Sequence, residues 1–216
     1  MVIACWSSKG GAGAAVVAAR LALLAAERAG GGGALLADLG GDAPAVLGLP
    51  EQEGPGLAGW LQAGAEVPPD ALGRIEVAAA PGLALLPRGP GDLAEDRAEV
   101  LAALLSTEAR QVVVDCGTGP TGAARRVAAA AERSVLVTRA CFVALRRALS
   151  HPLRPTEVVL VAEPGRSLTR VDLERALGVP VIAVIEVDPA VARAVDAGLL
   201  ASRLPRGLAR ELRDVA

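Results

Sequence analysis

A glycine-rich stretch near the start of the chain has the residue types that bind phosphate. It reads Ser8-Lys9-Gly10-Gly11-Ala12-Gly13-Ala14-Ala15 and lies between a predicted strand, Val2–Trp6, and a predicted helix, Ala14–Ala29. Glycines at such a junction let backbone N–H groups converge on an anion at the positive end of a helix. A glycine loop alone is a weak signal, but the strand–loop–helix context gives it weight. We therefore expect an anion-binding loop here.

The elements that must position this loop follow an alternating pattern. Short β-branched runs alternate with stretches rich in Ala and Leu, which is typical of a parallel sheet covered by helices. The predicted strands are Val2–Trp6, Ala34–Asp38, Leu83–Leu86, Gln111–Asp115, Ser134–Thr138, Glu157–Val161 and Val181–Val184. The predicted helices are Ala14–Ala29, Gly56–Ala63, Leu93–Leu105, Gly122–Ala131, Cys141–Leu149, Thr169–Ala176, Pro189–Ala197 and Arg206–Val215.

The fold class that follows is α/β, with a mostly parallel central sheet flanked by helices on both faces. We expect one domain over residues 1–216, because the length suits a single core and no long linker interrupts the chain. Residues 40–82 are rich in Gly and Pro, and we expect them to form an excursion at one edge of the sheet. Thr121 and Asp188 are predicted helix N-caps.

Composition excludes several classes of protein. The hydrophobic fraction is 52%, which argues against a disordered chain, and the net charge of −2 gives no basic field for DNA or anionic lipid. The longest apolar run, Ala12–Ala29, contains Arg20 and Glu27, so we expect a buried helix there. The first residues lack the features of a signal peptide, so we expect a cytoplasmic protein. Cys5, Cys116 and Cys141 form no metal-binding pattern and are expected to be small buried hydrophobes.

The loop resembles the deviant Walker A motif, KGGxGK[ST], of the MinD/ParA family of ATPases. Lys9, Gly10, Gly11 and Gly13 match that motif. Further along the chain, three stretches resemble family segments: "ALLADL" at 34–39, "QVVVDCG" at 111–117, which looks like the Walker B strand, and "GVPVIAVIEVDPAVARA" at 178–194. The resemblance spans nearly the whole chain and implies a P-loop NTPase fold. It also implies that Asp38, Asp115 and Gly117 lie at the nucleotide site.

The sequence departs from the motif at the residues that handle ATP and magnesium. Ala14 replaces the phosphate-binding Lys, and Ala15 replaces the Ser/Thr that ligates magnesium. Gly40 stands where the family usually carries a second Asp, and Glu163 follows the sixth of the predicted strands, near where the family often has an Asn beside the adenine. A hydrogen bond to a charged group contributes roughly 1.5–3 kcal/mol, so ATP affinity should fall by about two to four decades.

These departures predict negligible ATP hydrolysis, no catalytic residue, no magnesium and no resident cofactor, with weakened binding of ATP or ADP left open. The vestigial loop comprises Ser8, Lys9, Gly10, Gly11, Ala12, Gly13, Ala14 and Ala15, and the vestigial switch and Walker B residues are Asp38, Asp115 and Gly117. Three hypotheses follow: a pseudo-ATPase scaffold or localisation factor, a nucleotide-dependent dimerisation switch, and an active ATPase with unconventional metal use.

Lys9 is the one lysine of the chain. The resemblance implies that this lysine reaches across a dimer to phosphates held by the partner. It therefore predicts a homodimer, or a heterodimer with an active ATPase, with Lys9 at the interface; a relic without a present role is the alternative. Trp6 lies beside the loop and is either an interface anchor or the last core residue of its strand.

General likeness points to the CpaE/TadZ-like branch of the family, whose members are associated with pilus or secretion machinery; a cell-division role is the other option. Leu204, Leu208, Leu212 and Val215 form an apolar stripe within 203–216. Such a stripe can dock on a membrane or pack on the sheet, and Pro205 and the short length favour packing. Arg146, Arg147 and Arg154 near His151 are interpreted as a solvated surface rather than a DNA site.

Overall fold

The computed structural model describes residues 1–64 and 67–215, with no side-chain description for residue 69. Its strands are β1 (Val2–Ser7), β2 (Ala34–Asp38), β3 (Val77–Ala80), β4 (Leu83–Leu86), β5 (Gln111–Thr118), β6 (Arg133–Arg139), β7 (Glu157–Ala162) and β8 (Val181–Glu186). Its helices are α1 (Ala14–Arg28), α2 (Ala43–Leu47), α3 (Gly56–Gln62), the 3₁₀ helix η1 (Pro69–Ile75), α4 (Ala98–Thr107), α5 (Gly122–Ala130), α6 (Phe142–Ser150), α7 (Arg170–Leu177), α8 (Pro189–Asp196) and α9 (Arg206–Glu211).

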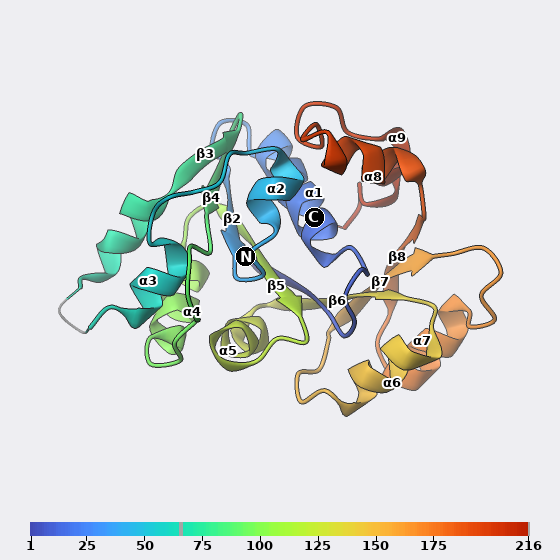
Figure 1. Ribbon diagram of the computed structural model, residues 1–216. Helices are drawn as coiled ribbons and strands as arrows, with labels where there is room; N and C mark the ends of the chain where they lie inside the picture. Colours follow the sequence, from blue (N-terminus) through green and yellow to red (C-terminus); the bar gives the residue numbers. More distant parts are fainter. Residues whose placement is uncertain (65–66, 216) are drawn as a thin grey trace.

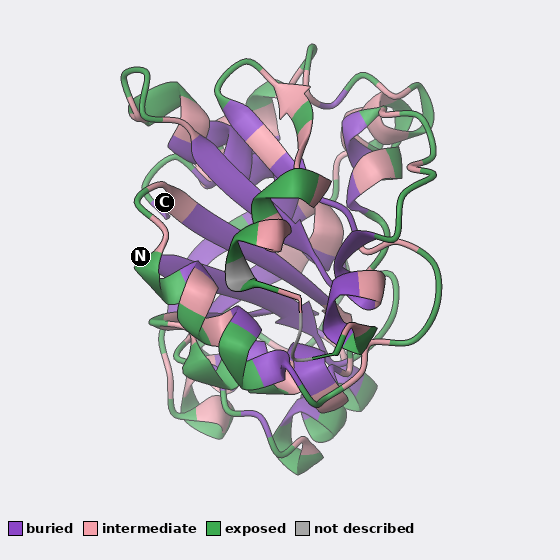
Figure 2. Cartoon of the chain, turned by 90° about the vertical axis from the view of Figure 1, so that its left-hand side faces the viewer, coloured by how far each residue is buried: buried purple, intermediate pink, exposed green. Residues whose placement is uncertain are grey.

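The strands form one eight-stranded sheet in the order β3-β4-β2-β5-β1-β6-β7-β8. Strand β3 pairs antiparallel with β4, and the other neighbouring pairs are parallel. The sheet is thus mostly parallel, as expected from strands that are buried on both faces. Figure 2 shows that burial follows the strands through the middle of the molecule.

Helices cover both faces of this sheet (Figure 1). Successive residues of β1 point to opposite faces, so that Ile3 and Cys5 join a core beneath α1, α2 and the C-terminal segment. Val2, Ala4 and Trp6 join the opposite core, to which α3, α4, α5, α6 and α7 contribute. The expected α/β architecture is confirmed, and the seven predicted strands are all present.

Residues 40–82 are more structured than the sequence predicted. They contain α2, α3, η1 and the edge strand β3. Strand β3 does lie at a sheet edge, but α2 packs against α1 and near α8, so the segment is not confined to that edge. The prediction that residues 40–82 form an excursion at one edge of the sheet is therefore wrong for α2, whereas α3 corresponds to the predicted helix Gly56–Ala63.

The start of one helix and the cap of another also differ from the prediction. Helix α4 begins at Ala98 rather than Leu93, because Arg97 is held by interactions with the preceding chain. Its guanidinium donates to the carbonyls of Trp60 and Val67 at 3.2 and 2.9 Å and lies 3.8 Å over the Trp60 ring. Asp188 caps α8 as predicted, whereas Thr121 stands at the N-cap position of α5 without a side-chain capping bond.

The C-terminal apolar stripe belongs to the core. Leu208, Leu212 and Val215 are 2%, 0% and 4% exposed and pack on the α1 face of the sheet, with Leu204 partly buried beside them. A stripe that is buried in the fold cannot face lipid at the same time. In this fold, the idea that the apolar side of 203–216 docks on a membrane is therefore wrong.

Candidate functional site

The glycine loop connects β1 to α1 with the geometry of an anion cradle. Gly11 and Gly13 have φ angles of 75° and 90°, a left-handed conformation that favours glycine. A Cβ atom added at Gly10, Gly11 or Gly13 would meet nothing within 4 Å, so the space over the loop is open. Gly13 caps α1 without a side-chain hydrogen bond, and the first turn holds no acidic residue. The orphan N–H groups of this turn are therefore suited to an anion.

The side chains of the loop divide into anchored and exposed ones. Ser8 is buried, and its hydroxyl donates to the carbonyl of Ala144 at 2.8 Å, which fixes the loop to α6. Lys9 is exposed, and within the described residues no ion pair or side-chain hydrogen bond engages it. Ala14 is buried and Ala15 half-buried, and their methyl groups place no polar atom beside the cradle.

Two carboxyls lie side by side at the ends of neighbouring strands. Asp38 pairs in register with Asp115, and Asp115 with Cys5, in a row on the α1 face of the sheet. Asp38 accepts the N–H groups of Gly41 and Ala43 at 2.6 and 3.2 Å. Burial raises the pKa of Asp38 to about 6, against the lowering effect of these two N–H groups.

Asp115 is the less satisfied of the two carboxyls. Its Oδ1 accepts the N–H of Gly117 at 2.9 Å, whereas the buried Oδ2 has no hydrogen-bond partner among the described residues. Burial, with a smaller contribution from Asp38, raises the pKa of Asp115 to about 7. The sequence prediction that Asp38, Asp115 and Gly117 lie at one site is consistent with this geometry.

Comparison with solved structures identifies the fold in which this arrangement lies. A ParA family ATPase from Chlorobium tepidum TLS matches with a TM-score of 0.78 and 21% identity over 99% of this chain and 97% of its own. The cell division ATPase MinD of Pyrococcus furiosus matches with a TM-score of 0.77 and 23% identity over 100% and 99%. This chain has the MinD/ParA fold. The sequence matches no known protein-family model and no curated protein.

A third match comes from an assembly. The Aquifex aeolicus MinC:MinD cell division protein complex matches with a TM-score of 0.72 and 20% identity, over 91% of this chain and 86% of that one. Identities at this level establish the fold and leave activity to the residues of the site. In the part of the chain that the structure describes, no helix is long and apolar enough to cross a membrane.

The glycine loop and the residues that follow it differ in how well they would fit the two parts of a magnesium–nucleotide complex. The open glycine loop fits a phosphate group. A magnesium ion needs oxygen ligands in near-octahedral geometry, and Ala15 supplies none. The residues present therefore do not fit a magnesium ion held beside the loop.

Close packing explains the glycine at position 40. A Cβ on Gly40 would lie 2.9 Å from Asp115 Oδ2 and 3.1 Å from the Cα of Gly117. The backbone N–H groups of Leu39 and Gly40 both donate to the carbonyl of Asp115, at 2.8 and 3.0 Å, which holds the two strand ends together. The aspartate that the MinD/ParA resemblance implies at this position has no room in this arrangement.

Glu163, just after the end of β7, is engaged by two arginines. Glu163 forms ion pairs with Arg139 and Arg166, and the hydrogen bond from Arg166 is the main cause of its lowered pKa. The Glu163 carboxylate is thus paired with two guanidinium groups. The resemblance implies an Asn near this position.

The start of α6 is a part of the site that the sequence did not predict. Cys141 stands at its N-cap, where the N–H of Ala144 and the nearby charge of Lys9 lower the pKa of the thiol. Phe142 and Val143 follow and are 69% and 46% exposed. Together with Lys9 these residues form the loop-side surface. The available signal in the sequence was a pair of large apolar residues, Phe142 and Val143, near the start of the predicted helix Cys141–Leu149.

Trp6 is not part of any surface. Its side chain is fully buried, its Nε1 donates to Ser134 Oγ at 3.0 Å, and its ring centroid lies 5.1 Å from that of His151. The hypothesis of an interface anchor was wrong, and the core alternative holds. Of the basic residues near His151, Arg146 and Arg147 are exposed, and Arg154 donates to the carbonyl of Leu149.

Proposed function

We propose that this chain is a pseudo-ATPase of the MinD/ParA fold that acts through protein–protein contacts, as a dimeric scaffold or localisation factor. One observation carries the proposal: the backbone of the phosphate loop is intact and open, while Ala14 and Ala15 present only methyl groups to it. The fold is also that of a MinD solved in complex with MinC, which is consistent with a role in assembly.

The chemistry of phosphoryl transfer supports an inactive site. Catalysis of this reaction consists almost entirely of positioning and of stabilising the charge on the transferred group. Here Lys9 is the one loop side chain with a positive charge, and it extends into solvent. The two carboxyls lie buried with raised pKa values, and neither faces a polar side chain at position 14 or 15.

The loop-side surface supports a contact role. Among the described residues no ion pair engages Lys9, which lies near Cys141 at the start of α6, so the surface combines a cation with the exposed apolar area of Phe142 and Val143. Aromatic residues are enriched at protein interfaces, and Phe142 is the single phenylalanine of the chain. We propose that this surface contacts a second copy or a related ATPase, in partitioning, division or a pilus-type machinery of the CpaE/TadZ kind.

A second candidate function is a nucleotide-dependent switch without hydrolysis. The open cradle and the unpaired N–H groups of α1 favour it, because they can bind a phosphate without the missing side chains. In that case the backbone of 10–13 would hold the phosphates, with Lys9 acting in the same subunit or across a dimer.

A hydrolysis assay tests the main proposal. Purified chain is incubated with ATP and Mg²⁺ beside a MinD ATPase, and ADP is measured. We expect turnover at the level of the protein-free control, also when Asp115 is changed to Asn. Magnesium-dependent turnover comparable to that of MinD, lost in the Asp115→Asn variant, would show an active ATPase with unconventional metal use and would refute the proposal.

A further inference from the structure

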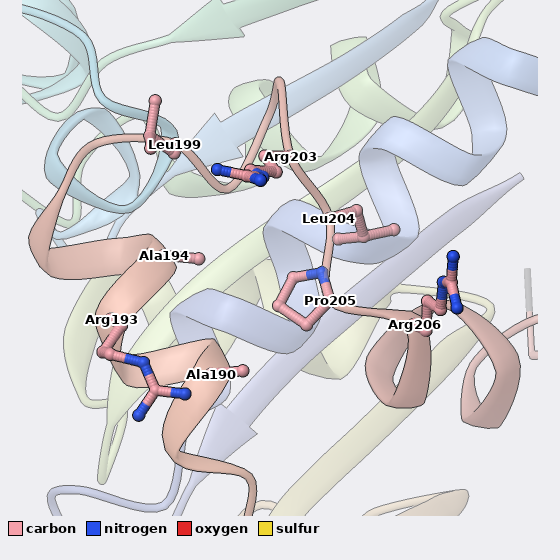
Figure 3. Close-up of a pocket in the computed structure, with 8 residues that line it drawn as sticks. All are labelled: Ala190, Arg193, Ala194, Leu199, Arg203, Leu204, Pro205 and Arg206. Carbon is pink, nitrogen blue, oxygen red and sulfur yellow. The ribbon is translucent and has the colours of Figure 1, made fainter.

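A pocket lies between α8 and the segment that leads into α9, and it has no part in the site described above. Its volume is about 550 Å³, within the range of pockets that bind small molecules. Figure 3 shows its lining, which consists of Ala190, Arg193, Ala194, Leu199, Arg203, Leu204, Pro205 and Arg206. No residue of the glycine loop and neither buried aspartate is among them.

Three arginines from three segments surround this pocket. Arg193 comes from α8, Arg203 from the turn after it, and Arg206 is the first residue of α9 (Figure 3). All three are exposed, and none forms an ion pair or a side-chain hydrogen bond within the described residues. Three uncompensated guanidiniums around one hollow create a local positive potential in a chain whose net charge is −2.

The carboxylate of Asp188, at the start of α8, is engaged as the cap of that helix. Asp188 Oδ1 accepts the N–H of Ala190 at 2.7 Å as the cap of α8, and Oδ2 lies toward Gly207. Guanidinium groups bind carboxylates and phosphates through paired N–H donors. The pocket is therefore suited to an oxyanion from outside the chain.

The remaining walls are apolar. Ala190 and Ala194 are one turn apart on the same face of α8, and Leu204 and Pro205 lie across the pocket from them (Figure 3). A bare inorganic ion would leave these walls in contact with water. A ligand with an apolar body would bury them, which is favourable because apolar surface is removed from water.

The pocket is preformed by its neighbours. The backbone N–H groups of Leu199 and Arg203 donate to the carbonyls of Ala194 and Leu199, both at 2.7 Å, which fixes the turn after α8. Leu200 and Leu208 are 0% and 2% exposed and anchor the segment to the core on both sides of the pocket. A ligand would then bind without the cost of ordering the backbone.

We propose that this pocket binds a small organic anion, a phosphate or carboxylate group carried on an apolar body. The oxyanion is held at the rim, which the guanidiniums of Arg193, Arg203 and Arg206 make positive, and the apolar body lies against Ala190, Ala194 and Leu204. The proposal is independent of whether the glycine loop binds nucleotide.

Calorimetric titration with octyl phosphate tests this proposal, with inorganic phosphate and octyl glucoside as probes that carry only one of the two features. We expect octyl phosphate to bind at least about tenfold more tightly than either. The Arg203→Gln and Arg206→Gln variants should each weaken its binding about tenfold, because each removes a charged hydrogen bond. Arg147→Gln, on α6 across the sheet, is the matched control and should leave the affinity unchanged. Thermal unfolding checks that all variants are folded.

Two results would overturn the proposal. The first is octyl phosphate binding that is no tighter than that of the two partial probes, or that is unaffected by the changes at Arg203 and Arg206. The second is co-sedimentation with phosphatidic acid vesicles that requires these arginines, without any binding of octyl phosphate in solution, which would assign them to a bilayer surface instead.

Discussion

At the scale of single residues, the buried carboxyl pair makes stability depend on pH. The raised pKa of Asp115 means that the folded chain retains its proton to a higher pH than the unfolded chain does. Its ionisation therefore costs stability as the pH rises from about 4 to about 7. Asp38, raised to about 6, acts in the same direction.

The Asp115→Asn variant removes this contribution. We expect the loss of unfolding free energy between pH 5 and pH 8 to be smaller in the variant than in the wild type, by on the order of 1 kcal/mol or more. Urea denaturation at the two pH values measures it, and Asp196→Asn, at an exposed site, is the control. An equal loss in wild type and Asp115→Asn would contradict the raised pKa.

The three cysteines provide a second prediction at this scale. Burial raises the pKa of the Cys5 and Cys116 thiols, whereas the backbone N–H of Ala144 lowers that of Cys141, which is half-buried. A disulfide reagent such as dithionitrobenzoate should thus react rapidly with one thiol in the folded protein and with three in denaturant. Cys141→Ser should abolish the rapid phase, and its persistence in that variant would show that a core cysteine is accessible.

The placement of some residues could be predicted from the sequence, and that of others could not. The loop and the two aspartates followed from motif and context, because their placement depends on strand ends that are fixed by local pattern. The burial of Trp6 did not, because Ser134 and His151, more than 120 residues away, decide it. The sequence grouped all three cysteines as buried, whereas Cys141 is not, since its exposure depends on where α6 begins.

At the scale of elements, α2 and α8 meet through two glycines. Gly48 has a φ of 74°, and a Cβ there would lie 2.0 Å from the carbonyl oxygen of Gly198, at the end of α8. This contact packs the end of α2 against the end of α8, the helix that lines one side of the arginine-lined pocket.

Changing Gly48 to Ala should therefore destabilise the fold strongly. We expect a loss of more than about 2 kcal/mol of unfolding free energy, because backbone must move. Gly165→Ala is the matched control: its φ is 78°, but nothing lies within 4 Å of the added Cβ, so only the conformational cost applies. Chemical denaturation of both variants measures the difference, and similar losses would contradict the packing.

The elements that sequence reasoning missed are short. Helix α2 has five residues and lies in a stretch rich in Gly and Pro, where periodicity is too brief to measure. Strand β3 has four residues, three of them alanine. Its Pro81-Gly82 turn into β4 was an available hairpin signal, since Gly82 adopts a φ of 71°. The long helices and the parallel strands were predictable because each buries a face, and the apolar residues that form this face recur at regular positions in the sequence.

At the scale of the whole molecule, the central claim is that this fold associates through its loop-side surface without using ATP chemistry. That surface retains Lys9 and the open loop and exposes Phe142 and Val143, while the cis-acting polar side chains are absent. The composition of the chain could not have located this surface, because a net charge of −2 describes the whole sequence and not one place on it. Its position depends on α6 meeting the loop through the Ser8–Ala144 bond.

Sedimentation velocity with and without ATP tests this claim most directly. We predict a dimer in both conditions, which becomes a monomer in the Lys9→Ala/Val143→Asp variant. Val171→Asp, a change of the same kind at an exposed valine on α7, is predicted to leave the dimer intact. A protein that is monomeric without nucleotide and dimeric only with ATP would contradict the account and establish the switch instead.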